Sequence, residues 1–341
     1  MSDQNLSTQQ TQHTSYTQYT PHSNADSLPS GVTKDWLNDL RDENGNRISD
    51  RAQGQLPEDP EEDAFQRKIF NGLSASSQFG FSISNAGDVN GDGYDDIIIG
   101  AHGYNSFTGR AYIYYGGINM NTTADVTITG AAASSFFGYS VSSAGDVNGD
   151  GYSDVVVGAY GYNSNTGRAY IYFGGALMNN TADVIVTGEA VSNFFGISVA
   201  SAGDMNSDGY SDVLIGASGN SSYTGRAYIY LGGASMNNSA DIILSGESAN
   251  SNFGTSVSSA GDVNADGFSD LIIGATGYNS NTGRAYVYFG GMFIDNIPDV
   301  IMNGESVNNY FGCSVSSAED INGDGYSDII IGAYGYSSNT G

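Results

Sequence analysis

The sequence predicts an all-β chain that folds as a β-propeller built from four-stranded blades. Two observations carry this prediction. From residue 73 to residue 341 one pattern recurs every 58 residues, with no insertion or deletion in the register. Within each repeat, four short apolar runs are separated by Gly, Asn and Ser. Four short antiparallel strands in a repeat of this length are typical of one propeller blade.

Four recurring features define the register. The Phe of a Phe-Gly pair stands at Phe79, Phe137, Phe195, Phe253 and Phe311. An Asp that opens an acidic loop stands at Asp88, Asp146, Asp204, Asp262 and Asp320. The Gly of a Gly-Ala pair stands at Gly100, Gly158, Gly216, Gly274 and Gly332. An Arg follows at Arg110, Arg168, Arg226 and Arg284.

The repeat at 131–188 illustrates the expected strands. Residues 137–145 alternate polar and apolar, 154–159 are a β-branched run typical of a buried strand, 167–175 alternate aromatic and small, and 183–188 supply the fourth strand. A parallel β-solenoid is the rival architecture, but its coils are usually shorter than this repeat.

The repeats give four complete blades and part of a fifth. The expected blades are 73–130, 131–188, 189–246, 247–304 and a partial blade at 305–341. Residues 67–72 resemble the fourth strand of a preceding blade. We therefore expect a truncated product or fragment. A five-blade ring completed by the N-terminal strand, and completion of the partial blade by another chain, are the alternatives.

Composition separates the propeller region, 65–341, from a polar region at 1–64. The polar region is rich in Ser, Thr, Gln and Asn near its start and is expected to be disordered and of low complexity. No N-terminal signal peptide and no apolar run long enough for a membrane helix is visible. Cys313 is the one cysteine, which excludes an internal disulfide framework.

The chain is strongly acidic, with a formal net charge of -27. This charge argues against nucleic acid or an anionic membrane surface as a partner. Because like charges repel one another in a compact fold, the charge also predicts that bound cations neutralise part of it. We expect Ca²⁺ to be this cation.

The acidic loops have the donor pattern of calcium sites. Each loop, such as DVNGDGYDD at 88–96, places side-chain oxygens at positions 1, 3, 5 and 9, a main-chain carbonyl at 7 and glycine at 6. Ca²⁺ takes six to eight oxygen ligands in flexible geometry, and glycine allows the sharp turn. We expect about five sites. The candidate metal ligands are Asp88, Asn90, Asp92, Tyr94 and Asp96; Asp146, Asn148, Asp150, Tyr152 and Asp154; Asp204, Asn206, Asp208, Tyr210 and Asp212; Asp262, Asn264, Asp266, Phe268 and Asp270; and Asp320, Asn322, Asp324, Tyr326 and Asp328, with Tyr and Phe acting through their carbonyls.

Other interpretations of these loops fit less well. An EF-hand needs a Glu at position 12 and an exit helix, but that position is Ile99 and a strand follows. Mg²⁺ resists giving up its waters to a cage made only of protein. Asp-Asn-Gly loops are also good turns, so a purely structural turn is the remaining alternative.

The order Phe-Gly, DxNxDGxxD, Gly-Ala and GRAYIYFGG resembles the FG-GAP repeat of integrin α subunits and their bacterial relatives. The resemblance covers residues 67–341 and implies a propeller with calcium in the hairpin between strands one and two, opposite the ligand surface. Two departures stand out. The proline after the family's Gly-Ala is replaced at His102, Tyr160, Ser218, Thr276 and Tyr334. Glu319 replaces the glycine before the fifth loop, so the fifth site departs furthest from the family pattern.

The loops between strands two and three carry a recurring aromatic residue, with one exception at Asn220. By resemblance these loops lie on the ligand face, where aromatic residues suit protein or sugar contacts; packing between blades is the alternative. The aromatic residues are Tyr104, Tyr162, Tyr278 and Tyr336. We also expect each repeated Arg to pair with a repeated Asp, at Asp125, Asp183, Asp241 and Asp299.

These features predict a calcium-binding, non-catalytic propeller for adhesion or recognition, with an extracellular protein or glycan as partner and an extracellular or cell-surface location. No catalytic residue and no other cofactor is assigned. A lectin with one sugar site per blade is one alternative. The propeller part of a secreted hydrolase or lyase is another, although two of the three histidines, His13 and His22, lie in the polar region.

Overall fold

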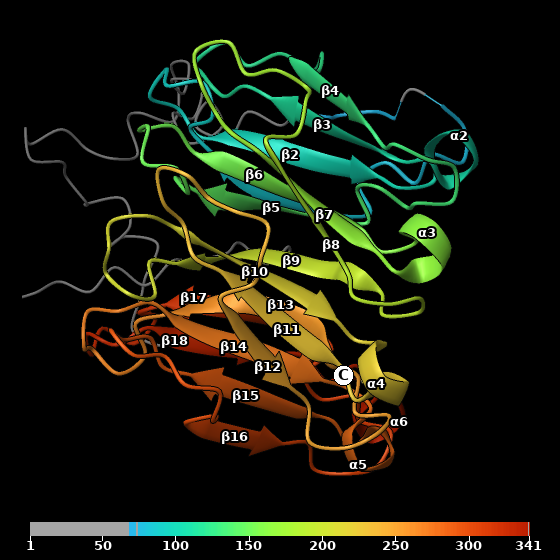
Figure 1. Cartoon of the computed structure of the whole chain (residues 1–341), viewed down its shortest axis with the longest axis vertical. Coiled ribbons are helices and arrows are strands. Elements are labelled where there is room, and N and C mark those ends of the chain that lie inside the picture. Colours follow the sequence, from blue (N-terminus) through green and yellow to red (C-terminus); the bar gives the residue numbers. More distant parts are fainter. Residues whose placement is uncertain (1–67, 73, 340) are drawn as a thin grey trace, which may run out of the picture. The chain divides into compact units, whose positions relative to one another are not determined.

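The computed structural model describes residues 68–72, 74–339 and 341 of the chain. The chain divides into two units, Met1–Lys68 and Ile69–Gly341, and the described strands and helices belong to the second (Figure 1). The predicted disorder of residues 1–64 lies outside the described residues. Where the chain is described, no helix has the length and apolar character needed to cross a bilayer.

The second unit is an all-β propeller of antiparallel blades, which confirms the predicted fold class. The first two blades consist of β1 (Ile83–Gly87), β2 (Asp96–Ala101), β3 (Arg110–Tyr114) and β4 (Val126–Thr129), then β5 (Ser140–Gly145), β6 (Asp154–Ala159), β7 (Arg168–Tyr172) and β8 (Val184–Thr187). The next two consist of β9 (Phe195–Gly203), β10 (Asp212–Ala217), β11 (Arg226–Tyr230) and β12 (Ile242–Ser245), then β13 (Phe253–Gly261), β14 (Asp270–Ala275), β15 (Arg284–Tyr288) and β16 (Val300–Asn303). The last described sheet pairs β17 (Val315–Glu319) with β18 (Asp328–Ile331).

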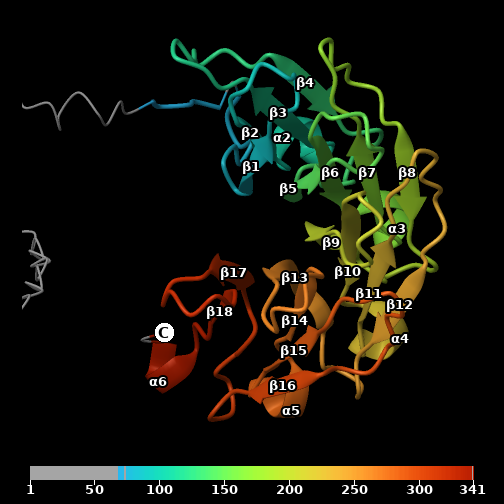
Figure 2. The same ribbon diagram turned by 90° about the vertical axis from the view of Figure 1, so that its left-hand side faces the viewer.

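The first strand of each sheet lies innermost. β5 packs against β1 and β9, and β13 packs against β9 and β17, so successive blades are neighbours along the chain. In Figure 2 the sheets follow one another in sequence order, and β1 and β17 lie apart, so the ring is not closed.

Each complete inner blade is buried on both faces, which explains its alternating sequence. In β7, Tyr170 and Tyr172 pack toward the first blade, whereas Ala169 and Ile171 pack toward the third. Side chains alternate between the two faces of a strand, so both residue classes of RAYIY are buried. The run of valines in β6 is buried for the same reason, since a strand enclosed on both sides needs no polar face.

The Phe of the second to fifth Phe-Gly pairs joins neighbouring blades. Phe195 is fully buried, and its ring meets Tyr228 edge-on at 5.2 Å between centroids. Its backbone forms a bridge with Gly167 of the preceding blade. Gly167 has φ +83, and a Cβ there would lie 2.1 Å from the carbonyl oxygen of Phe195. The close approach of the two backbones therefore requires glycine.

Five one-turn segments precede the third-strand position of the blades: α2 (Tyr104–Phe107), α3 (Tyr162–Asn165), α4 (Asn220–Tyr223), α5 (Tyr278–Asn281) and α6 (Tyr336–Asn339). In α3, Asn163 and Ser164 have φ of 48° and 57° with positive ψ, so this turn is left-handed. Asn and Ser tolerate such a turn better than bulky residues do, and short polar side chains dominate these segments.

The expected pairing of the repeated Arg with the repeated Asp is wrong. The antiparallel register pairs Arg168 with Thr187, at the end of the hairpin opposite Asp183. Asp183 instead accepts a hydrogen bond from the backbone N–H of Phe173 at 2.7 Å. The guanidinium of Arg168 lies over the ring of Tyr162, 3.7 Å from its centroid.

This cation–π contact gives the repeated loop tyrosines a structural role. It recurs for Arg110 with Tyr104 and for Arg284 with Tyr278, also at 3.7 Å. Where Asn220 replaces the tyrosine, Arg226 keeps an ion pair with Glu189 at 2.7 Å, and Arg284 forms the equivalent ion pair with Glu247 in addition to its contact with Tyr278. The Arg therefore keeps a partner in each complete blade, although the partner changes.

Replacement of the buried Phe195 by Ala should lower the free energy of unfolding by about 3–5 kcal/mol, because it leaves a cavity where two blades meet. Urea unfolding followed by circular dichroism measures the change. Leu177→Ala is the control, because Leu177 is 94% exposed and its loss should cost no more than about 0.5 kcal/mol. Equal losses in the two variants would contradict the packing role.

A double-mutant cycle with Arg168→Met and Tyr162→Leu should give a favourable coupling free energy of about 0.5–1 kcal/mol, because the pair is partly exposed. The same cycle on Arg226 and Asn220 is the internal comparison and should show no cation–π coupling, since Asn220 has no ring. Additive effects at Arg168 and Tyr162 would show that the contact contributes nothing to stability.

Candidate functional site

The five acidic loops connect the first and second strands of the five sheets. In the second blade the loop runs from the end of β5 at Gly145 to the start of β6 at Asp154. The pairing of β5 with β6 contains a bulge between Ser143 and Gly145. Gly145 has φ +73, and a Cβ there would lie 2.3 Å from the Ser211 hydroxyl of the next blade. The bulge bends the strand and directs it into the loop.

Within this loop the first aspartate organises the backbone. Asp146 Oδ1 accepts hydrogen bonds from the N–H groups of Gly149 and Asp150, and Oδ2 accepts from Gly151. Asn148 Nδ2 donates to Asp150 Oδ2 at 2.9 Å. The oxygens predicted at positions 1, 3 and 5 therefore belong to one hydrogen-bonded network.

The ninth residue of the loop is a buried anchor. Asp154 is fully buried; its Oδ2 accepts from Val147 N–H at 2.9 Å and its Oδ1 from Gly174 N–H at 2.7 Å. The carboxylate thus joins the loop, the second strand and the segment after the third strand. Each oxygen keeps a lone pair beyond these bonds.

Burial and neighbouring charge act on this anchor together. The pKa of Asp154 is raised to about 7, mainly by burial and in part by repulsion from Asp150 and Asp146, while the hydrogen bonds from Gly174 and Val147 oppose the rise. The equivalent pKa values of Asp212 and Asp270 are raised to about 6 by the same causes. The three carboxylates of one loop therefore lie close enough to repel one another.

The first four loops are also bonded to the following blade. Ser211 N–H donates to Asp146 O at 2.9 Å, and Gly233 N–H donates to Val147 O at 2.8 Å. The same pair of bonds joins the first loop to the second blade and the third loop to the fourth blade. The acidic loops therefore form part of the contact between blades, a role that the sequence pattern did not predict.

The loops fit a hard cation in their donor chemistry. They offer carboxylate, amide and carbonyl oxygens and carry no Lys or Arg within their nine residues. As the side chains stand, the carboxylates bond to backbone N–H groups, and no group of three or more His, Cys, Asp or Glu is arranged to hold a metal in the described part of the chain. Occupation would require a side chain such as Asp150 to exchange its present partners for the cation.

The loops are not equivalent. At the fourth loop position, Ser207 and Ala265 stand where the other loops have glycine, with φ of 55° and 58°. Glu319, before the fifth loop, has φ 54° where the other repeats have glycine. A left-handed conformation costs a residue with a Cβ about 1–2 kcal/mol. The backbone conformation of loops three to five therefore carries this cost, whereas that of loops one and two does not.

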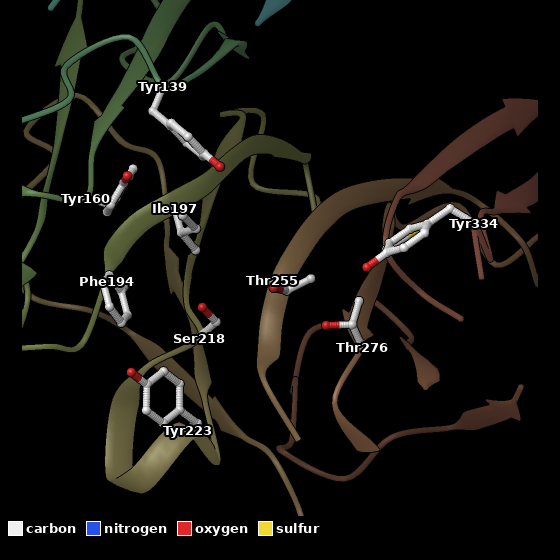
Figure 3. A pocket seen from close by; sticks show the side chains of 10 residues that line it. Tyr139, Tyr160, Phe194, Ile197, Ser218, Tyr223, Thr255, Thr276 and Tyr334 are labelled. Carbon is white, nitrogen blue, oxygen red and sulfur yellow. The ribbon is translucent and has the colours of Figure 1, made fainter. Parts of the chain in front are cut away.

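A pocket of about 470 Å³ lies at the other end of the strands (Figure 3). Two repeat positions supply most of its lining: the residue after Phe-Gly and the residue after Gly-Ala. The first set is Tyr139, Ile197, Thr255 and Cys313, and the second is Tyr160, Ser218, Thr276 and Tyr334. Phe194 and Tyr223 complete the lining, which contains no charged residue.

Aromatic rings continue from this pocket across the first two blades. Tyr160 stacks on Phe136 at 4.9 Å and meets Tyr139 edge-on at 4.6 Å. His102 lies 5.1 Å from Tyr139 and 4.5 Å from Phe81, between ring centroids. Burial lowers the pKa of His102, which keeps the imidazole neutral near neutral pH.

The sequence shows that the residue after Gly-Ala departs from the family's proline at Tyr160 and its equivalents, but it does not place this residue beside the one after Phe-Gly. The antiparallel hairpin brings the start of the first strand beside the end of the second. A search for repeat positions that do not repeat would have found this set.

Comparison with known proteins agrees with this architecture. The FG-GAP repeat family model matches residues 79–114, 137–172, 195–230, 253–288 and 311–341. The chain is 50% identical over 50 residues to integrin alpha-6 of Gallus gallus. That alignment covers 14% of this chain and 4% of the relative, so it spans a small part of the integrin subunit. The five matched repeats, in register with the five sheets, show that the chain belongs to the FG-GAP repeat family.

Proposed function

We propose that this chain is a calcium-stabilised, non-catalytic propeller that recognises a ligand outside the cell. The observation that carries the proposal is that repeated and variable residues lie at opposite ends of the strands. Repeated acidic residues build loops at one end of the strands, while variable residues line the pocket at the other end. The FG-GAP repeats and the integrin alpha-6 similarity support an adhesion or recognition role.

Calcium would act on the loops by neutralising carboxylates that repel one another. In the second blade, Asp146, Asn148 and Asp150 would supply side-chain oxygens and Tyr152 its carbonyl, with Asp154 held in place by its two backbone bonds. Because the loop also bonds to the next blade, a cation there would strengthen the junction as well as the hairpin. At a free calcium concentration 100 times the Kd, one site adds about 2.7 kcal/mol to stability.

The calcium requirement supports an extracellular or cell-surface location. Calcium modules outside cells typically bind with Kd values of about 10⁻⁴–10⁻³ M, which match an environment rich in calcium. Similarity to integrin alpha-6 favours the same assignment.

The pocket supports recognition without catalysis. Its lining offers aromatic faces from Tyr139, Tyr160 and Phe194 and hydroxyls from Ser218 and Thr276, with no carboxylate or imidazole. A hydrolase or lyase needs a general acid or base at the reacting bond, and for that role this lining offers only tyrosine hydroxyls and the Cys313 thiol. We therefore propose that an uncharged part of an extracellular protein ligand binds here.

A lectin is the second candidate, because aromatic faces beside hydroxyls also suit sugars. The pocket is a single asymmetric site lined by different residues in successive blades. It therefore supports one glycan per chain and disfavours one weak site per blade.

Calcium should raise the melting temperature in comparison with EGTA, and isothermal titration should find five sites, one per loop. In Asp150→Asn the titration should find one site fewer, because the variant loses a charged ligand. Its stability in EGTA should stay within about 0.5 kcal/mol of the wild type, since Asn keeps an acceptor for Tyr152 N–H. Asp183→Asn is the control, because Asp183 has the same charge but caps a backbone N–H outside the loops. If calcium leaves the melting temperature of the wild type unchanged, the acidic loops are structural turns and the calcium proposal is wrong.

Arrays of extracellular proteins and of glycans should yield a ligand that binds with a stoichiometry of one per chain. Tyr160→Ala should weaken the binding of this ligand by about tenfold or more, because the variant loses an aromatic face at the pocket. Tyr162→Ala is the control, because Tyr162 lies outside the pocket lining, under Arg168. Binding with a stoichiometry near the blade number would support the repeat lectin. Binding that both variants weaken equally would place the ligand elsewhere.

A further inference from the structure

The first blade exposes a sheet face that the following three blades bury. Ile83 of β1 is 71% exposed, whereas its equivalents in the next blades, Val141, Val199 and Val257, are 7%, 7% and 8% exposed. In each of those blades the preceding blade covers this position. Phe70, Phe79, Ile83, Ile97 and Ile99 instead line an open apolar pocket of about 680 Å³.

The last sheet exposes the opposite half of the same interface. Ile330 of β18 is 62% exposed, whereas its equivalents Ile98, Val156, Leu214 and Ile272 are fully buried against the following blade. Ile321, in the loop before β18, is 77% exposed, whereas Val89, Val147 and Met205 are fully buried. The two ends of the repeat array therefore expose complementary surfaces. Inside the molecule, the equivalent two surfaces pack against each other where one blade meets the next.

The N-terminal end of the described chain already supplies a part of this interface. Phe70 stands 58 residues before Ile128 of β4 and packs on Tyr114 with 4.6 Å between ring centroids. Gly72 approaches Phe79 as Gly130 approaches Phe137, since added Cβ atoms would lie 2.8 and 2.7 Å from the Cβ of each Phe. Residues 69–72 therefore occupy the outer-strand position of a preceding blade. The described residues supply no first, second or third strand beside them, and β17–β18 is a pair of first and second strands.

We propose that the chain associates head to tail with a second copy of itself, the β17–β18 face of one copy packing on the β1–β3 face of the other. The occupant is a second copy because the two faces of one molecule do not meet (Figure 2). The contact is heterologous, so each copy keeps one free face and longer chains of copies form at higher concentration. The position of the third strand stays open at such a junction, which weakens it compared with the junctions inside the molecule.

Charge sets the conditions under which this contact forms. Each copy carries a formal charge of -27, so copies repel one another at low ionic strength. The contacting residues are Ile and Phe, whose burial salt does not oppose. Added sodium chloride should therefore strengthen self-association, the opposite of its effect on an interface formed by ion pairs.

Sedimentation velocity of the full chain at increasing concentration tests the proposal, in calcium and in EGTA. The wild type should form dimers and larger species. Ile83→Glu and Ile330→Glu should each weaken self-association by about tenfold or more, because each buries a charge in one half of the contact. Both side chains are exposed in the single molecule, so both variants should keep the wild-type circular dichroism and melting temperature. Leu177→Glu, at an exposed position between β7 and β8, is the control that should still associate.

Mixing the two variants gives the decisive result. Ile83→Glu keeps an intact β17–β18 face and Ile330→Glu keeps an intact β1–β3 face, so the mixture should form a one-to-one dimer that does not grow further. A wild type that stays monomeric at all concentrations would overturn the proposal. So would association that persists in either variant alone, or a mixture that stays monomeric.

Discussion

Each blade depends on a carboxylate buried at the start of its second strand. Asp154 has no exposed surface, and its two oxygens bind the loop before it and the segment after the third strand. An unpaired buried carboxylate would be costly, and these bonds reduce the cost without neutralising the charge. The raised pKa shows that the cost is not fully offset. A cation in the loop would remove the repulsion from Asp146 and Asp150, so the fold and its proposed metal depend on the same residue.

The alternating strand sequence follows from a second constraint, that each sheet is enclosed by its neighbours. Val155 and Val157 of β6 face one adjacent blade, and Val156 faces the other. A sheet with two apolar faces cannot end an array without exposing one of them to water. The outer faces at Ile83 and Ile330 are the result, and they follow from repetition of one blade sequence up to both ends of the array.

Much of this fold could be predicted from the sequence, because a repeat of fixed length reports strand number, strand order and blade boundaries directly. The acidic loops were placed correctly between the first and second strands for the same reason. The partner of Arg168 could not be predicted, because Arg168 and Asp183 lie at opposite ends of an antiparallel hairpin. The backbone hydrogen bond between Ser211 and Asp146 joins two blades. It could not be predicted, because it leaves no pattern in the sequence other than the 58-residue spacing of the loops. The metal ligands remain a prediction, since the carboxylates bond to backbone N–H groups in the described loops.

Repetition also separates residues that hold the fold from those that can distinguish ligands. A residue such as Phe195 or Asp154 meets the same surroundings in the second, third and fourth blades, so the same side chain satisfies all of them. The residue after Gly-Ala lines the pocket, and there the chain carries Tyr160, Ser218 and Thr276 in successive blades. If each blade bound its own copy of one ligand, these positions would need the same chemistry in each blade. Their divergence therefore favours a single ligand that touches several blades, with aromatic contacts at one part of the pocket and hydroxyl contacts at another.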